Sequence, residues 1–131
     1  MGGPYVYKDV ESLNGNTMVG THQCVALVQI KAGAPTTPNW SAGTPVRGQM
    51  GLAKGTAIAT FVNGRYLSHP HGNHAALYVS QDAEGILVMD QWAHDKKKKT
   101  ISFHKLRFQG RDRHGNLIHP SDNGDAFSVI N

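Results

Sequence analysis

The stretch HAALYVSQDAEGILVMDQW, residues 74–92, holds two apolar runs separated by a short polar turn. The runs cover residues 74–80 and 86–92, and the turn between them begins at Asp82 and ends at Gly85. Apolar runs of this length, bounded by turn residues, predict β-strands, and so short a connection predicts an antiparallel hairpin. We therefore expect an antiparallel sheet that contains this hairpin.

The register of the hairpin decides which polar side chains share a face. If it turns around Ala83, residue 76 faces Asp90, and Asp90 then lies on the same face as His74. A shift of half a residue brings Gln91 to that face instead. We favour Asp90 as the partner of His74 and keep Gln91 as the alternative, and outside such a pairing both are ordinary polar residues at a strand end.

The segment CVALVQIKAG, residues 24–33, predicts a short and mostly buried helix. Its apolar residues are dense, Gly33 supplies a helix end and Pro35 follows. The helix starts at or near Cys24, the single cysteine of the chain. A helix N-terminus lowers the pKa of a thiol and offers free N–H groups to an oxyanion, to which Gln23 adds a side-chain donor.

The rest of the chain supplies shorter elements. Residues 57–62 predict a strand that turns at Asn63-Gly64, and residues 100–108 predict a strand near the edge of a sheet. The apolar C-terminal residues 127–130 are expected to dock, and residues 34–48 to form a loop anchored by Trp40. These elements predict an α+β fold in a single domain over residues 1–131.

Composition narrows the classes of partner. The single cysteine excludes an intramolecular disulfide, and no apolar run approaches the length of a membrane span, so we expect no membrane insertion. We expect synthesis in the cytoplasm without a cleavable signal, because the N-terminal segment has no basic region followed by an apolar one. The net charge of +4 favours an anionic partner. The lysine run at residues 96–99 is interpreted as a solvated turn, and no nucleic-acid-binding signature accompanies it.

Cys24 and His74 are the candidate nucleophile and base. A lone cysteine is often a small buried hydrophobe, so the catalytic interpretation needs a partner. The chain has eight histidines, and His74 differs from the others because it opens an apolar strand directly after a turn. From the rim of a sheet its ring can reach a thiol on a helix packed against that sheet, with Asp90 to orient it.

A metal site is the competing interpretation of the histidines. The segment HPHGNH places His69, His71 and His74 close together in sequence. However, it contains no carboxylate, and its Pro and Gly do not hold the side chains on one face. We therefore predict no metal site and no cofactor.

Several motifs together resemble the CHAP domains, cysteine- and histidine-dependent amidohydrolases related to NlpC-type and papain-like enzymes. QCVALV at residues 23–28 resembles their cysteine signature, NHAALYV at residues 73–79 their histidine strand, and GILVMDQW at residues 85–92 the strand with the third polar residue. The segments GTAIATF, TISFHKL and DAFSVI are also similar to those of small bacterial type VI secretion amidase toxins that act on peptidoglycan. Asp90 stands where many CHAP domains have Glu or Asn.

This resemblance implies a papain-like fold, with Cys24 as nucleophile, His74 as base and then acid, Asp90 as the orienting residue and Gln23 at the oxyanion. It implies a cysteine amidase or endopeptidase of peptidoglycan that acts in the periplasm or cell wall after secretion or lysis. A cognate immunity protein would then inhibit it in the producing cell. Gln91, Trp40 and Trp92 are assigned to the oxyanion or substrate site, although either tryptophan is equally explained as part of the core. The alternative is a non-catalytic module that binds the cell wall or another anionic polymer, with a vestigial triad.

Overall fold

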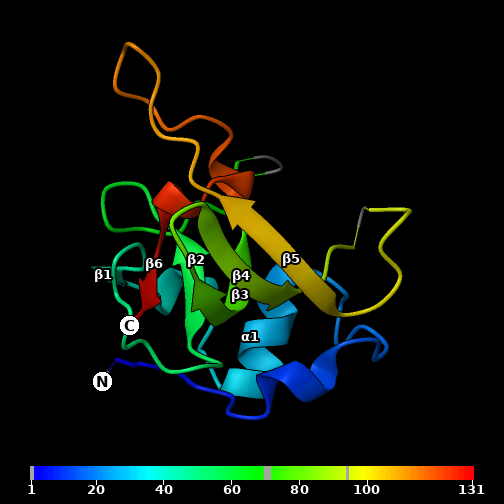
Figure 1. Ribbon diagram of the computed structural model, residues 1–131. Helices are drawn as coiled ribbons and strands as arrows, with labels where there is room; N and C mark the ends of the chain where they lie inside the picture. The colour runs from blue at the N-terminus through cyan, green and yellow to red at the C-terminus, as the bar shows by residue number, and fades with distance from the viewer. Residues whose placement is uncertain (1, 70–71, 94) are drawn as a thin grey trace.

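The computed structural model describes residues 2–69, 72–93 and 95–131. Within these residues the chain forms one α-helix, α1 (Cys24–Ala32), and a six-stranded antiparallel sheet (Figure 1). The strands are β1 (Ala42–Pro45), β2 (Ala57–Thr60), β3 (Ala75–Gln81), β4 (Gly85–Asp90), β5 (Ser102–Arg107) and β6 (Phe127–Ile130). Short 3-10 helices are η1 (Val10–Leu13), η2 (Thr37–Asn39), η3 (Pro120–Asp122) and η4 (Gly124–Ala126). The predicted α+β class is confirmed.

The strand order of the sheet is β1-β6-β2-β3-β4-β5. The C-terminal residues dock as predicted, and they do so as an interior strand, because β6 pairs with both β1 and β2. The strand predicted near an edge, β5, is the last in this order and pairs with β4. The hairpin predicted at Asn63-Gly64 is also present, since both residues have positive φ and Val62 bridges Arg65.

The central hairpin, β3 and β4, has the register predicted from its sequence. Leu77 pairs with Met89 and Tyr78 with Val88, so position 76 faces Asp90. A β-bulge beyond Tyr78 shifts the pairing by one residue, but only on the side toward the turn. The bulge therefore leaves the end of the hairpin that carries the candidate site unaffected.

The turn of this hairpin depends on Asp82 and Gly85. The carboxylate of Asp82 accepts hydrogen bonds from the backbone N–H groups of Glu84, at 2.8 Å, and Gly85, at 3.2 Å. These bonds close the turn locally, as aspartate commonly does. Gly85 is required because a Cβ atom there would lie 2.3 Å from the carbonyl oxygen of Leu106 on β5.

Helix α1 begins at Cys24 and ends before Gly33, whose left-handed φ of 80° caps it. Both ends agree with the prediction. The expectation of a mostly buried helix was wrong in part, since Leu27 and Val28 are fully buried but Ile30 is 55% exposed. Only one side of α1 packs against the sheet, but apolar residues occur all around the helix, so the sequence did not indicate which side is exposed.

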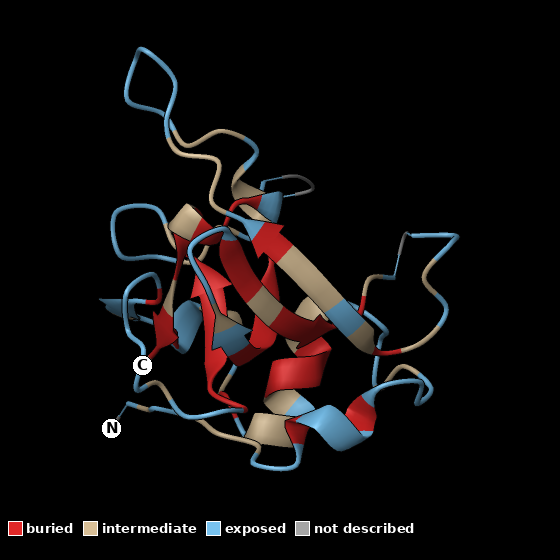
Figure 2. Ribbon diagram, in the orientation of Figure 1, coloured by how far each residue is buried: buried red, intermediate tan, exposed pale blue. Residues whose placement is uncertain are grey.

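Both faces of the sheet are covered, so its central strands are buried (Figure 2). On β3, Leu77 and Val79 belong to a cluster that includes Leu27 of α1. The alternate residue Tyr78 belongs to a second cluster on the other face, which includes Phe127 of β6. Burial on both faces explains why β3 and β4 read as continuous apolar runs rather than as alternating ones.

The expectation of a loop over residues 34–48 was incomplete. Trp40 anchors this segment as expected, being 4% exposed, but residues Ala42–Pro45 form β1 against β6. Gly43 and Pro45 are poor strand formers, and their pairing at the edge of the sheet comes from contact with the distant C-terminus. Among the described residues, no helix is long and apolar enough to cross a membrane.

Candidate active site

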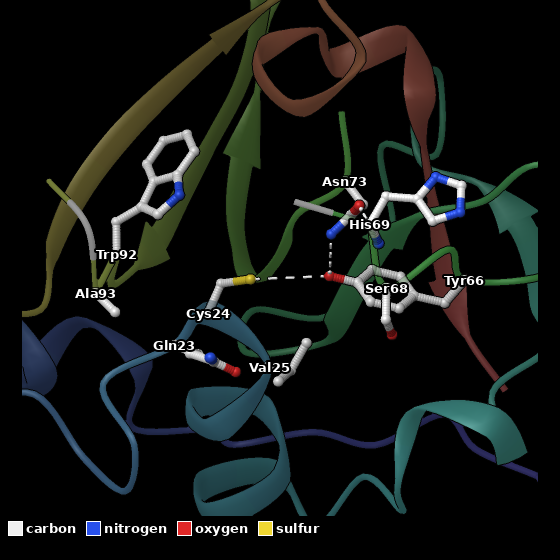
Figure 3. Close-up of a pocket in the computed structure, with 9 residues that line it drawn as sticks. All are labelled: Gln23, Cys24, Val25, Tyr66, Ser68, His69, Asn73, Trp92 and Ala93. Atoms are coloured by element: carbon white, nitrogen blue, oxygen red, sulfur yellow. Dashed lines mark hydrogen bonds between the residues drawn. The ribbon is translucent and has the colours of Figure 1, made fainter. Parts of the chain in front are cut away.

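Cys24 opens α1 and lines a pocket of about 330 Å³ (Figure 3). The pocket is formed by the start of the helix, the segment that leads into β3 and the segment that follows β4. Its lining residues are Gln23, Cys24, Val25, Tyr66, Ser68, His69, Asn73, Trp92 and Ala93. The thiol thus lies where the N–H groups of the first helical turn, which have no intrahelical acceptors, are also presented.

Tyr66 is the polar neighbour of the thiol on the side of the pocket opposite Trp92 (Figure 3). Its hydroxyl lies 3.8 Å from Cys24 Sγ and accepts a hydrogen bond of 3.2 Å from Asn73 Nδ2. Because the amide of Asn73 fills one acceptor position, the hydroxyl hydrogen is directed elsewhere, and the sulfur is within its reach. Tyr66 was not found from the sequence, in which it follows a hairpin turn without any motif.

His74 and Asp90 form a buried pair at the rim of the sheet. His74 immediately precedes β3 and Asp90 is the last residue of β4, and the register places both on one face. His74 Nε2 lies 2.8 Å from Asp90 Oδ2, and both side chains are fully buried. The structure therefore places Asp90, rather than Gln91, against the imidazole.

The electrostatics couple the thiol to the imidazole. Burial raises the pKa of Cys24, but its interaction with the His74 ring and with the backbone N–H of Ala75 lowers it below the ordinary 9.0. Burial lowers the pKa of His74, but the hydrogen bond to Asp90 and the interaction with Cys24 raise it from 6.5 to about 9. The two shifts favour a thiolate beside an imidazolium, which is the reactive form of a cysteine nucleophile.

The tautomer of His74 follows from its contacts. Nε2 faces a carboxylate oxygen, which can only accept, so Nε2 carries a hydrogen. The other ring nitrogen, Nδ1, is buried and has no hydrogen-bond partner of ordinary geometry among the described residues. With Nε2 committed to Asp90, Nδ1 is the atom that can exchange a proton with Cys24.

Trp92 covers the imidazole. Its ring stacks on that of His74 with the centroids 4.5 Å apart and an angle of 23° between the planes, and it also lines the pocket. Trp92 therefore shields the His74–Asp90 pair from water on the side that faces the substrate space. Its predicted position beside the groove agrees with the structure.

Asp90 has two further partners that the sequence did not reveal. His104 Nδ1, from β5, lies 2.7 Å from the same Oδ2 atom that His74 contacts, and Lys98 Nζ donates to Oδ1. Burial raises the pKa of Asp90, but the hydrogen bonds to His104 and His74 outweigh this effect and hold the pKa well below its ordinary value. Interpreting the whole lysine run as a solvated turn was therefore wrong for Lys98.

The histidine cluster considered for a metal does not come together as the sequence suggested. His71 lies outside the described residues, His74 is buried, and the ring of His69 points away from Cys24 (Figure 3). A different group brings potential ligand atoms within 4.8 Å of one another, namely His74, Asp90 and His104. Because these side chains already hydrogen-bond directly and Lys98 neutralises the carboxylate, we interpret the group as a proton network.

Trp40 is a core residue. It is 4% exposed, its Nε1 donates to the carbonyl oxygen of Pro35 at 2.7 Å, and its ring packs on Tyr66 with centroids 4.8 Å apart. Of the two assignments offered for Trp40, the groove is wrong and the core is confirmed, because the side chain is buried and packs against Tyr66. The hypothesis of a polymer-binding module loses one of its two tryptophans.

Gln91 is fully buried and ties the segment before α1 to the end of β4. Its Nε2 donates to the carbonyl oxygens of Val19, at 3.0 Å, and Gln23, at 2.8 Å, and its Oε1 accepts from Val19 N at 2.9 Å. The expectation that Gln91 contacts the substrate was wrong, since every polar atom of its side chain is already paired. Gln23 itself lines the pocket and precedes the helix, as expected.

We predict that Gln91→Leu destabilises the fold by roughly 3 kcal/mol, because it removes three hydrogen bonds of a fully buried side chain and leaves backbone groups of Val19 and Gln23 without these partners. The loss should appear in urea unfolding monitored by circular dichroism. Gln81→Leu, which also removes several amide hydrogen bonds but lies partly exposed at the far end of β3, is the control with the smaller loss. Equal stability of Gln91→Leu and the wild type would contradict the assigned role.

A thiol at a helix tip beside a buried imidazole–carboxylate pair is the arrangement by which proteins activate a cysteine as a nucleophile. The profile of the family described as domesticated amidase effector 2 matches residues 4–130, so the chain belongs to this family. It is 42% identical to the type VI secretion amidase effector 2 protein of Salmonella typhi over 97% of this chain and 98% of that protein.

Two further comparisons agree. The chain is 35% identical to domesticated amidase effector 2 of Ixodes scapularis, over 93% of this chain and 81% of the tick protein. A solved structure of a type 6 secretion amidase effector 2 superimposes with a TM-score of 0.90 and 39% identity, covering 98% of this chain and 94% of the other. The likeness therefore extends over the whole fold and includes the strands that carry the site.

Proposed function

We propose that this chain is a cysteine amidase that hydrolyses amide bonds in the peptide stems or crosslinks of peptidoglycan. The observation that carries the proposal is the Cys24 thiol at the tip of α1, coupled to the buried His74–Asp90 pair and open to a pocket. Relatives named as amidase effectors support the reaction class. The net charge of +4 suits an anionic wall.

The proposed mechanism uses the chain's own residues and needs no cofactor. The Cys24 thiolate attacks the carbonyl carbon, and the first-turn N–H groups of α1, with Gln23, bind the oxyanion. The proton held by His74 passes to the leaving amine, and a thioester to Cys24 remains. His74 then takes a proton from water as the resulting hydroxide attacks the thioester. The bond to sulfur breaks, the acid product leaves, and the Cys24 thiolate is restored beside the protonated His74.

The finer fold assignment follows the same features. We assign the chain to the papain-like proteins of the CHAP and NlpC type, because a helix with cysteine at its N-terminus packs on an antiparallel sheet that presents the histidine. The order Cys24, His74, Asp90 along the chain supports this assignment. The site then consists of a nucleophile at the start of a helix and a base directly before a strand, and these two elements meet at the rim of the sheet.

Digestion of purified sacculi tests the proposed activity. We expect the protein to release soluble muropeptides, seen by mass spectrometry, together with new free amino groups. Binding to sacculi without any new amine would contradict hydrolysis and favour the alternative of a wall-binding module. The masses of the products identify the bond that is cut.

We further propose that the protein is an exported antibacterial effector that acts in the periplasm and is inhibited in the producing cell by a cognate immunity protein. The type VI secretion label of its relatives supports export. Expression directed to the bacterial periplasm should cause lysis that depends on Cys24, whereas cytoplasmic expression should not. Harmless periplasmic expression of an active protein would contradict the effector role.

A further inference from the structure

Three cationic or hydrogen-donating side chains meet on one buried carboxylate. Asp90 Oδ2 is shared by His74 Nε2, at 2.8 Å, and His104 Nδ1, at 2.7 Å, while Lys98 contacts Oδ1. The mechanism proposed above uses only the contact to His74. His104 therefore contacts the catalytic carboxylate but has no role in that mechanism.

The sheet places His104 rigidly. In the antiparallel pairing Asp90 faces Ser102 and Val88 faces His104, so His104 lies one diagonal step from Asp90 on the same face. Its side chain is 24% exposed, and its Nε2 lies 3.1 Å from Asp122 Oδ1 in η3. The ring is thus held between two carboxylates that come from different elements.

Hydrogen-bond chemistry fixes the protons in this network. A carboxylate oxygen only accepts, so both rings that contact Asp90 Oδ2 must donate to it. The Nε2 atom of His104 also faces a carboxylate, and the arrangement is fully satisfied when both nitrogens of this ring carry hydrogens. Asp90 then divides its negative charge between His74 on one side and His104 and Lys98 on the other.

We propose that His104 is a positioning residue that locks the Asp90 carboxylate against His74 and, by donating to the same oxygen, limits the charge that Asp90 supplies to the catalytic imidazole. The proposal rests on the proposed function, because it assumes that His74 serves Cys24. His104 acts through Asp90, since Trp92 lies between the substrate pocket and the rings, with its centroid 4.5 Å from that of His74 and 6.0 Å from that of His104.

The charged groups around His104 come from every neighbouring element. They are Asp90 from β4, His74 at the start of β3, Asp122 from η3, and Lys98 with Asp95, Lys97 and Lys99 from the segment before β5. Of these, Asp90 and Asp122 contact the ring directly. His104 competes with His74 for the charge of Asp90. Removing this donor should therefore stabilise the His74 imidazolium, because more of the negative charge of Asp90 is left to it.

Two substitutions separate position from charge. In His104→Asn the amide nitrogen stands the same number of bonds from Cα as Nδ1, so the donation to Asp90 can persist without a cationic ring. In His104→Phe the donation is lost while an aromatic ring still fills the site. His114→Asn, at an exposed histidine in the loop of residues 110–117, is the matched control.

For His104→Phe we expect kcat to fall about tenfold or more with little change in KM, because Asp90 is released from its position. The basic limb of the pH profile should move to higher pH, and the NMR titration of the His74 ring should move the same way. His104→Asn should lose less kcat and show a smaller shift in the same direction, because its amide can still donate to Asp90, and the control should match the wild type. Rescue of kcat by Asn relative to Phe marks the positioning role.

Unchanged kcat, pH profile and His74 titration in both variants would overturn the proposal. So would equal losses in both variants that follow a lower thermal midpoint without any shift of the basic limb. If His104→Phe does not fold, the pH shift in His104→Asn decides. The NMR titration needs no substrate, so it still tests the coupling if wild-type protein releases nothing from sacculi and the proposed function itself fails.

Discussion

Cys24→Ala is expected to reduce the release of muropeptides from sacculi by about 1,000-fold or more, because no other group takes over as nucleophile. The sulfur is coupled to His74 and lies in the pocket, whereas Tyr66, at 3.8 Å, is a weak nucleophile with a raised pKa, since burial and the neighbouring Cys24 oppose its ionisation. Activity is measured as new free amines per time at saturating protein.

The control for this variant lies on the same helix. Ile30→Ala removes more side chain from α1 but at a position that is 55% exposed, so it should keep wild-type activity. Thermal unfolding of both variants checks that the helix remains in place. Release by Cys24→Ala at the rate of the wild type would remove the cysteine from the mechanism and return it to the status of a packed hydrophobe.

Asp90→Asn should have the second large effect, on both activity and stability. The amide cannot accept from His74, His104 and Lys98 together, and its own N–H groups then point at donors. We expect kcat to fall by about 1,000-fold, since the imidazole loses its orienting carboxylate. We expect a loss of about 3 kcal/mol in the free energy of unfolding, since buried cationic groups lose their partner.

The stability difference between wild type and Asp90→Asn should depend on pH. The pKa of Asp90 is lowered in the fold, so its contribution exists above the unfolded pKa of about 3.9 and is lost as pH falls toward the folded value. The pKa of His74 is raised to about 9, so its contribution is complete below about pH 6.5 and is lost as pH rises through 9.

The gap between the two unfolding free energies should therefore be widest between about pH 4 and 6.5 and should narrow on both sides. Urea unfolding over a pH series measures it. Glu84→Gln, at a carboxylate that is 70% exposed and 3.6 Å from Arg107, is the control and should differ little from wild type at any pH. A constant gap from acid to alkaline pH would contradict the buried ion network.

The parts of the site that sequence predicted are those set by local rules. The start of α1 at Cys24 follows from apolar density and from the Gly33 stop, and the facing of His74 and Asp90 follows from a turn centred near Ala83. Within a hairpin, the position of the turn fixes which residues of the two strands pair. The contact between His74 and Asp90, 16 positions apart, could therefore be predicted. The bulge beyond Tyr78 did not disturb this count because it lies toward the turn.

The parts that sequence missed depend on pairing between distant segments. His104 meets Asp90 only because β5 pairs with β4 in one register, and nothing local in its strand fixes that register. In a strand, residues two apart lie on the same face, so His104 shares a face with the buried Leu106, and knowledge of the β5 register would have turned this into a prediction. Lys98 could not be singled out because residues 96–99 are all lysine, and nothing in the sequence distinguishes one from another.

Gln91 and Trp40 show the opposite error, in which polar or aromatic residues near a candidate site were assigned to substrate. Each turned out to have its polar atoms paired inside the protein. A buried glutamine that binds backbone groups cannot be distinguished from a ligand-binding one by residue type alone, because both need hydrogen-bonding partners. Only the position of residues 19–23 against the end of β4 decides between them.

The coupling between Cys24 and His74 is the central claim, and the pH dependence of Cys24 alkylation tests it most directly. The rate of reaction with iodoacetamide, followed by the mass of the intact protein, gives the apparent pKa of the single thiol. We predict a pKa below 9.0 in the wild type and a higher pKa in His74→Ala, because burial raises it once the imidazole is gone. The same pKa in both proteins, or a thiol that does not react at neutral pH, would contradict the account.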